Sequence, residues 1–306
     1  MRTGLNESEP QPRFAFAFAR HVRNGSSFQG ENLVLQLASS EWWRQTQLWV
    51  VVGGLAMFWT IESIWPRKGP GRFRARLAHT GSNLGIWVLG AIFLSLLAGN
   101  SYGAVLSWLG LSGIGLLHFV SLPVWLDLLV AFLLLDFADY AYHRLSHRAR
   151  WLWLLHSVHH SDTDVDVSTN LRQHPVHLLT TLMWKIVAFA AVGAPLELAM
   201  ARETLVILIA HLHHTAIGWP AWVERTFGRV FISPRAHWVH HSPADGETDA
   251  NFGTTLVLWD RLCATYVEPT RPGPGRFGLN ALSEKRWQTP LGMLLTPIRA
   301  RKLERL

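Results

Sequence analysis

Histidine is the residue type in this chain that points most directly to chemistry. Thirteen of the 16 histidines lie between His143 and His241, in short groups rather than singly. The groups are His143/His147, His156/His159/His160, His174/His177, His211/His213/His214 and His237/His240/His241. Imidazole is the commonest side-chain ligand of transition metals, so this grouping predicts metal binding.

The spacing within the groups has a helical meaning, because residues three and four apart share one face of an α-helix. His143 and His147 are four apart, and the motif His-x-x-His-His occurs twice, at 156–160 and 237–241. We expect each motif to lie on a helix and to aim its imidazoles at one point. The same spacing makes His-x-x-x-His a zinc site in metalloproteases.

The number of histidines exceeds the needs of one ion, since a zinc ion takes about four ligands. Eight to eleven clustered imidazoles predict two ions with four or five ligands each. Imidazole suits zinc, copper, iron and nickel, so the ligand type leaves the metal open. The single cysteine, Cys263, excludes an intramolecular disulfide framework and any cysteine-rich zinc module.

Long apolar stretches must position these histidines, and a membrane span needs about 20 such residues. The stretches are Leu48–Trp65, Leu84–Gly99, Leu122–Tyr142 and the pair Leu178–Ala194 and Leu196–Ala210. The weaker, glycine-rich run Tyr102–Val120 is expected to cap the bundle or re-enter the membrane. We therefore predict an all-α, polytopic integral membrane protein with about four membrane helices or hairpins and a cytosolic, histidine-rich helical cap.

Basic residues indicate the orientation of this bundle. The segments Arg67–Arg76 and Arg144–Arg150 are basic, and no lysine or arginine lies between Leu77 and His143. The positive-inside rule places both basic segments in the cytoplasm, although an ordinary solvated loop would read the same way. The histidine groups adjoin the same ends of the apolar runs, which predicts a multi-pass protein with its active site on the cytoplasmic side. We attribute the net charge of +7 to this topology and expect no nucleic-acid partner.

Seven segments resemble, in order and spacing, the fatty acid hydroxylase/sterol desaturase superfamily. They are Asp136-x6-His143-Arg-Leu-Ser-His147, His156-Ser-Val-His-His-Ser161, Arg172-Gln-His-Pro175, the pair His211 and His214, Pro234-x-x-His237-Trp-Val-His-His-Ser242, Asn251-Phe-Gly253 and Leu258-Trp-Asp-Arg-Leu262. The resemblance runs from about Asp136 to Tyr266. It implies a helical membrane fold and a histidine-ligated di-iron centre that uses O2 as co-substrate to hydroxylate or desaturate a lipid.

The resemblance also implies which histidines bind the two iron ions. The expected ligands are His143, His147, His156, His159, His160, His174, His211, His214, His237, His240 and His241. His213 is an alternative ligand or a neighbour of one, and His177 is expected to be structural or solvated. The three histidines outside the cluster, His21, His79 and His118, are expected to have ordinary roles.

Four polar residues are candidates for holding the ligands in place, because metal-bound histidines usually donate their second ring N–H to a carboxylate or carbonyl. Asp136 and Asp139 precede His143 within an apolar run, where an unpaired carboxylate is costly. We expect one of them to orient a ligand; the alternative is an ion pair with Arg144 or another basic residue. Asp260 is a weaker candidate, and Asn251 is expected to position water or backbone near the centre.

These expectations divide the chain into three parts. Residues 1–47 form an N-terminal cytosolic or interfacial arm, residues 48–268 a membrane-embedded di-iron hydroxylase or desaturase domain, and residues 269–306 a C-terminal tail. A sterol, a fatty acyl chain or another membrane lipid fits as substrate. The chain has no Gly-x-Gly-x-x-Gly motif and one cysteine, so we expect electrons from a separate reductase with a ferredoxin or a b-type cytochrome. The basic segments would steer that donor, bind anionic lipid, or only set topology.

Three other functions make different demands on the sequence. A metal-binding protein or transporter without oxygenase activity predicts polar residues along a membrane path, and Leu84–Gly99 offers no metal ligand. A membrane haem protein predicts paired histidines deep inside the spans. A dizinc hydrolase predicts carboxylate ligands among the histidines, and the His-x-x-His-His motifs contain none.

Overall fold

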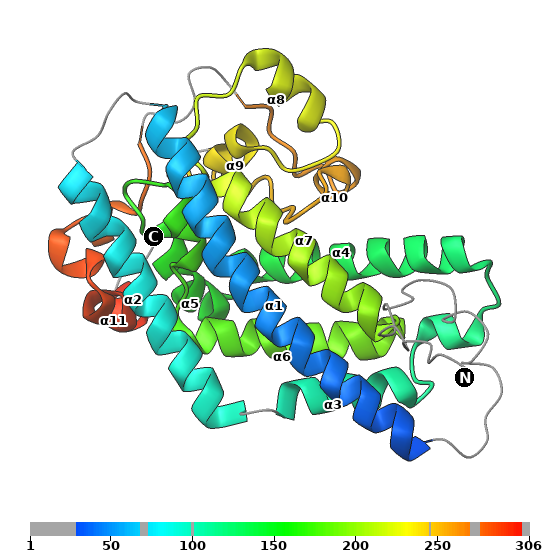
Figure 1. Cartoon of the computed structure of the whole chain (residues 1–306). Helices are drawn as coiled ribbons and strands as arrows, with labels where there is room; N and C mark the ends of the chain where they lie inside the picture. Colours follow the sequence, from blue (N-terminus) through cyan, green and yellow to red (C-terminus); the bar gives the residue numbers. More distant parts are fainter. Residues whose placement is uncertain (1–28, 68–72, 99–100, 245, 270–275, 302–306) are drawn as a thin grey trace, which may run out of the picture.

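The computed structural model describes residues 29–67, 73–98, 101–244, 246–269 and 276–301, and these are helices joined by loops, with two isolated β-bridges (Figure 1). This confirms the all-α prediction. The α-helices are α1 (Gln29–Ile64), α2 (Phe73–Ala98), α3 (Ser101–Leu111), α4 (Val124–Arg148), α5 (Arg150–His160), α6 (Pro175–Val192), α7 (Leu196–His214), α8 (Ala221–Phe227), α9 (Pro234–His240), α10 (Leu258–Leu262) and α11 (Pro290–Ala300). The 3-10 helices are η1 (Leu116–Phe119), η2 (Val167–Leu171), η3 (Asn280–Leu282) and η4 (Lys285–Gln288).

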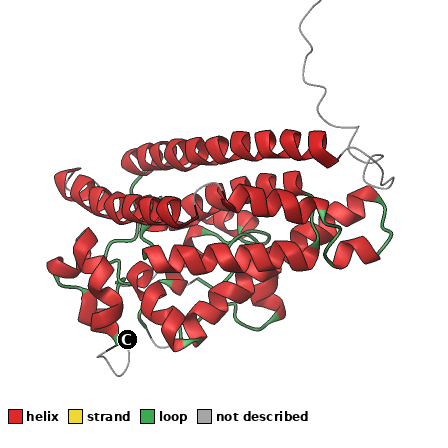
Figure 2. Ribbon diagram, turned by 90° about the horizontal axis from the view of Figure 1, so that it is seen from below, coloured by secondary structure: helices red, strands yellow, loops and turns green. Residues whose placement is uncertain are grey.

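Five long helices form the body of the molecule. Helix α1 packs on α7, α2 packs on α6, and α4 packs on both α6 and α7. Figure 2 shows several of them running lengthwise across the molecule. An apolar cluster that includes Leu106, Leu135, Phe189 and Met200 joins α3, α4, α6 and α7. Close van der Waals packing of these apolar side chains holds the helices together.

The short helices α5 and α9 lie where α4 and α7 end (Figure 1). Helix α5 packs on α4, α9 packs on α7, and η2 contacts α1, α2 and α7. All the histidine motifs lie on these helices or on the helix ends that they cover. The structure therefore has the histidine-rich helical cap that the sequence predicts.

Within the part of the chain that the structure describes, three helical segments are long and apolar enough to cross a membrane: Gln45–Ile64, Phe73–Ala98 and Pro175–Val192. Large apolar side chains such as Leu84, Val88 and Ile92 of α2 are exposed, as expected of a surface that faces lipid. We also expected spans over α4 and α7. Those helices carry more charge in their apolar stretches, namely Asp127, Asp136 and Asp139 in α4 and Glu197, Arg202 and Glu203 in α7.

The piece between α2 and α4 does not cross. Helix α3 has 11 residues, which is about 16 Å at 1.5 Å per residue and well short of a hydrocarbon core of about 30 Å. The following turn packs tightly against the α6–α7 connection. A Cβ on Gly115 would lie 2.3 Å from the Cα of Gly193, and both glycines have positive φ, 119° and 71°. Only glycine permits this approach.

The predicted ends of the chain are described in part. Residues 1–28 of the expected arm lie outside the described residues, and α1 begins at Gln29, within that arm. Most of the Pro/Gly-rich segment 269–278 also lies outside them. The expected tail contains α11, which packs against α5 and α2.

Candidate metal centre

Nine imidazoles form two adjoining groups at the capped end of the bundle. In each group every residue offers a ring nitrogen, and these nitrogens lie within 4.8 Å of one another. His143 and His147 are half-buried and the other seven are buried. The five-imidazole group is His143, His147, His156, His160 and His240, and the four-imidazole group is His159, His214, His237 and His241.

Four helices deliver these side chains. Ala149 is extended (φ −84°, ψ 113°) and ends α4 while starting α5, so the chain turns between them. This turn brings His156 back toward His143, with their Nε2 atoms 3.2 Å apart. Helix α9 begins at the Ser233 cap with Pro234 in its first turn, a favourable helix start.

Each His-x-x-His-His motif serves both groups. His156 and His160 face the five-imidazole group, whereas His159 faces the four-imidazole group. In the second motif the roles are exchanged, since His240 joins the five-imidazole group while His237 and His241 join the other. The expectation that each motif aims at one point was therefore wrong. Adjacent residues on a helix differ by about 100° around its axis, so the two neighbouring histidines that end each motif point in different directions.

The ring nitrogens fit a metal ligand set. The buried Nε2 atoms of His147, His160 and His240 have no hydrogen-bond partner among the described residues. In the other group, Nε2 of His214 lies 3.1 Å from Nε2 of His159 and 2.9 Å from Nε2 of His237. Ligands about 2.1 Å from one ion would stand roughly 3.0–3.4 Å apart, so these separations suit a shared ion.

Backbone carbonyls set the tautomer of two imidazoles in the five-imidazole group. Nδ1 of His143 lies 2.8 Å from the Phe252 oxygen, and Nδ1 of His240 lies 2.7 Å from the Ala250 oxygen. A carbonyl oxygen only accepts, so each Nδ1 carries the proton and donates it. The Nε2 lone pair is then free to bind a metal, the arrangement usual for histidine ligands.

Burial also keeps these imidazoles neutral. The pKa of His160, His240 and His241 lies well below its usual range because burial penalises the charged form, and neighbouring imidazoles add to the effect. Neutral imidazole is the form that binds metals, and proton competition is weak when the pKa is low.

Two predicted ligands lie outside the groups. His174 caps the N-terminus of α6, where its Nδ1 accepts a hydrogen bond of 3.2 Å from the Val176 amide. His211 is buried, with Nδ1 2.8 Å from the Ile207 oxygen. The structure thus brings together nine of the eleven residues that the resemblance implied.

The remaining histidines have varied surroundings. His213 stacks on His237 with ring centroids 3.9 Å apart, and it does not belong to either group. His177, which we expected to be structural or solvated, is buried, and its Nδ1 lies 3.1 Å from Gln173 Oε1. Its surroundings fit the structural alternative and not the solvated one. His79 bridges the carboxylates of Asp162 and Asp166 at 2.8 and 3.2 Å. That contact joins α2 to the segment after α5.

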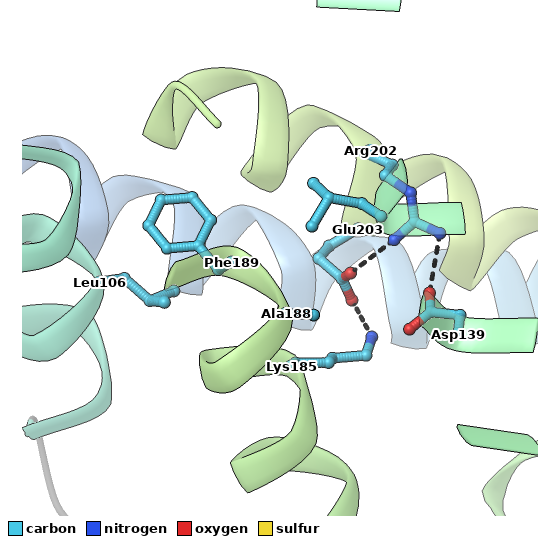
Figure 3. A pocket seen from close by; sticks show the side chains of 8 residues that line it. Leu106, Asp139, Lys185, Ala188, Phe189, Arg202 and Glu203 are labelled. Atoms are coloured by element: carbon cyan, nitrogen blue, oxygen red, sulfur yellow. Dashed lines mark hydrogen bonds and ion pairs between the residues drawn. The ribbon is translucent and has the colours of Figure 1, made fainter. Parts of the chain in front are cut away.

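The acidic residues of α4 pair with an arginine of α7. Arg202 donates to Asp136 at 3.1 Å. It also donates to Asp139 at 2.8 Å, and Glu203 pairs with both Arg202 and Lys185 (Figure 3). Among the described residues, the hydrogen-bond partners of these two aspartates are Arg202, Trp259 and the Leu256 amide, and none of these is an imidazole. The expected orienting role is replaced by the alternative of an ion pair, with Arg202 instead of Arg144. Arginine can reach both carboxylates because α4 packs on α7.

Asp260 and Asn251 act on backbone beside the imidazoles. Asp260 accepts from the amides of Phe252 and Gly253 at 2.8 and 2.7 Å. Asn251 Nδ2 donates to the carbonyl oxygens of Ala236 and Val267 at 2.9 and 3.0 Å. Sequence reasoning missed Asp249, whose Oδ1 lies 3.1 Å from Nδ1 of His147. It lies in a loop without a recognisable motif.

Parts of the two basic segments are engaged within the protein. The guanidinium of Arg67 lies 4.2 Å from the ring centroid of Trp238, and Arg76 pairs with Glu62. Lys68 and Arg72 lie outside the described residues. Arg148 and Arg150 are exposed on the capped end.

Residues 128–265 match the fatty acid hydroxylase domain family, and this range contains all nine imidazoles of the two groups. This part of the chain is therefore similar to the fatty acid hydroxylase/sterol desaturase superfamily, as its histidine motifs indicated. The matched range begins within α4 and ends just after α10. The superfamily domain therefore spans both the apolar helices α6 and α7 and the histidine-rich cap.

Proteins with similar sequences are lipid hydroxylases and monooxygenases by name. The ornithine lipid hydroxylase OlsE of Rhizobium tropici is 29% identical over 159 residues, which cover 51% of this chain and 46% of that protein. Human alkylglycerol monooxygenase is 29% identical over 139 residues, covering 44% of this chain and 29% of that protein. The alkylglycerol monooxygenase of Caenorhabditis elegans is 27% identical over 144 residues, covering 47% and 28%.

The chain thus spans less than half the length of these curated relatives. No solved structure is significantly similar to it.

Proposed function

We propose that this chain is an O2-dependent lipid hydroxylase whose two imidazole groups hold two iron ions. The observation that carries the proposal is the pair of adjoining groups of five and four imidazoles within a fatty acid hydroxylase domain. Imidazole-only ligand sets in a membrane protein whose relatives are lipid monooxygenases favour iron over zinc. Carboxylates do not belong to either group among the described residues, which argues against a dizinc hydrolase.

The proposed reaction converts a C–H bond of the lipid to C–OH. One atom of O2 enters the product and the other leaves as water, with two electrons and two protons supplied from outside. The iron ions would supply the O2 chemistry. The chain itself holds neutral imidazoles in fixed tautomers, and the cap of α5 and α9 covers them from water. If a second hydrogen were removed from the adjacent carbon instead of a hydroxyl being added, the product would be an alkene and the enzyme a desaturase.

We propose a polar membrane lipid as the substrate, of the amino-lipid or ether-lipid class. The names of the relatives, ornithine lipid hydroxylase and alkylglycerol monooxygenase, support this class. Sterols and simple fatty acyl chains remain candidates within the superfamily chemistry. The apolar exposed helices α1, α2 and α6 would present the lipid from the membrane side, and the cap would face the cytoplasm.

We further propose that a separate protein supplies the electrons, a reductase acting through a ferredoxin or a b-type cytochrome. Arg148 and Arg150, which are exposed beside the five-imidazole group on α4 and α5, could attract an acidic donor.

An isotope experiment tests this function directly. The full chain, purified in detergent and loaded with Fe(II), would be incubated with ferredoxin, its reductase, NADPH and a panel of ornithine lipid, alkylglycerol and sterol under ¹⁸O2. We expect one lipid to gain a single ¹⁸O atom, and His240→Ala to give no product. Turnover without O2, or iron flux in proteoliposomes without any oxidised lipid, would contradict the proposal and favour a hydrolase or a transporter.

A further inference from the structure

The four-residue segment Asp249–Phe252 forms hydrogen bonds to three of the imidazoles in the five-imidazole group. Asp249 holds His147 through Oδ1, the Ala250 oxygen accepts from His240, and the Phe252 oxygen accepts from His143, at 3.1, 2.7 and 2.8 Å. In every case the imidazole uses Nδ1. The segment Asp249–Phe252 therefore directs three Nε2 atoms toward the centre of one group.

The segment has an uncommon backbone that places these acceptors. Asp249 and Asn251 have φ of 59° and 53°, in the left-handed region that most residues avoid. The alternation turns the Ala250 and Phe252 carbonyls toward the histidines of α9 and α4. A conformation of this kind persists only when surrounding contacts fix it.

Two side chains supply those contacts. The carboxylate of Asp260 accepts from the amides of Phe252 and Gly253, one on each oxygen. Asn251 bonds to Ala236 on α9 through Nδ2 and accepts from the Val267 amide at 2.9 Å. Asp260 and Asn251 are themselves fully buried. They touch the imidazoles only through the segment that they hold.

The four-imidazole group lacks this support among the described residues. Nδ1 of His214 lies 2.6 Å from the Ala210 oxygen of its own helix, and Nδ1 of His159 lies 3.2 Å from Gln173 Nε2. Nδ1 atoms of His237 and His241 are buried without a hydrogen-bond partner there. The two groups are therefore held by different parts of the chain.

We propose that the Asp249–Phe252 segment is the positioning element of the five-imidazole group alone, with Asp249, Asn251 and Asp260 as its positioning residues. The inference rests on the proposed function to the extent that both groups bind a metal. It predicts that damage to the segment weakens one metal site and leaves the other intact.

Co²⁺ titration of the metal-free full chain in detergent tests this, followed by absorbance and by metal analysis after gel filtration. Asp249→Gly keeps the positive φ but removes the acceptor for His147, whereas Asp249→Asn keeps an acceptor oxygen and serves as the matched control. Asp260→Asn leaves one acceptor oxygen for two amides. We expect Asp249→Gly and Asp260→Asn to bind one of two Co²⁺ ions about 10- to 100-fold more weakly, and Asp249→Asn to resemble wild type.

Double variants assign the weakened site. Combined with His147→Ala, Asp249→Gly should cause little further loss, because both act on the same group; combined with His214→Ala, the two losses should add. Unchanged affinity in both Asp249→Gly and Asp260→Asn would overturn the inference, as would equal loss at both sites. Failure of the wild-type chain to bind Co²⁺ or iron would instead contradict the proposed function on which the inference depends.

Discussion

Individual imidazoles in this site are neutral, buried and held by hydrogen bonds at one nitrogen. His143, His240 and His214 each donate from Nδ1 to a backbone carbonyl oxygen. Because the carbonyl fixes the proton on Nδ1, the opposite nitrogen keeps its lone pair. A side chain in this state can bind a metal without first losing a proton.

Substitution of one grouped histidine should separate ligands from other buried histidines. We expect His240→Ala to lower the iron content and abolish lipid oxidation, because it removes a nitrogen from the five-imidazole group. His174→Ala should keep its iron and lose about 1 kcal/mol of stability, since His174 caps α6. Metal analysis and thermal unfolding of both purified variants check this; iron loss in His174→Ala would restore His174 as a ligand.

Acid should destabilise the metal-free protein through the same imidazoles. The pKa of His160, His237, His240 and His241 is lowered by burial, so below a pH of about 6.5 the unfolded chain binds protons that the folded chain does not. Stability then falls as pH falls, by up to about 1.4 kcal/mol per pH unit for each such group. Unfolding of the chelator-treated chain between pH 8 and pH 5 measures this. A flat profile would contradict neutral, buried imidazoles.

At the scale of helices, α4 and α7 are joined by charge. Arg202 of α7 binds Asp136 and Asp139 of α4, and Asp136 also accepts from the indole of Trp259 at 2.9 Å. Trp259 belongs to α10, so one carboxylate connects two long helices to the cap. Such a network stabilises only while every charge has its partner.

Removal of the arginine should therefore be costly for the fold. Arg202→Leu leaves the buried carboxylate of Asp136 and the half-buried carboxylate of Asp139 without their cation, and we expect a loss of about 3–5 kcal/mol in detergent. The surface control Arg286→Leu, whose pair with Glu284 is exposed, should change stability by less than about 1 kcal/mol. Thermal unfolding compares them. Equal stability of the two variants would show that the α4–α7 charges do not support the fold.

The sequence predicted the elements better than their contacts. Apolar runs predicted the positions of α1, α2 and α6, because that signal is local and periodic. The family resemblance implied all nine grouped imidazoles, whereas their spacing alone predicted only that they bind metal. The pairing of Arg202 with Asp136 could not be foreseen, since 66 residues separate them. The role of Asp249 depends on a left-handed backbone that no local pattern announces.

At the scale of the whole molecule, the structure has two unlike ends. The groups of imidazoles, α9 and α10 lie at the end where α4 and α7 finish, whereas the glycine turn at Gly115 and Gly193 lies at the other end, where α6 finishes and α7 begins. The apolar helices connect the ends. We have proposed that the histidine-rich end faces the cytoplasm.

The single cysteine tests this orientation without an engineered label. Cys263 follows α10 at the histidine-rich end and is partly exposed. A membrane-impermeant maleimide should label it in permeabilised cells and not in intact ones. In Cys263→Ser/Ser121→Cys, the cysteine at the exposed position 121 before α4 should be labelled in intact cells as well as in permeabilised ones. Labelling of Cys263 in intact cells would place the site on the outer side.

The two His-x-x-His-His motifs, each shared by both imidazole groups, leave no room for insertions or deletions within them. His159 and His160 face different groups, as do His240 and His241, so a single peptide bond on each of two helices spans the boundary between the groups. Inserting or deleting one residue within 156–160 or 237–241 would rotate the later side chains by about 100° and move each histidine off its group. We expect an insertion or deletion in either of these two segments to abolish metal binding. In the exposed turn at 246–249, we expect insertions before Asp249 to be tolerated.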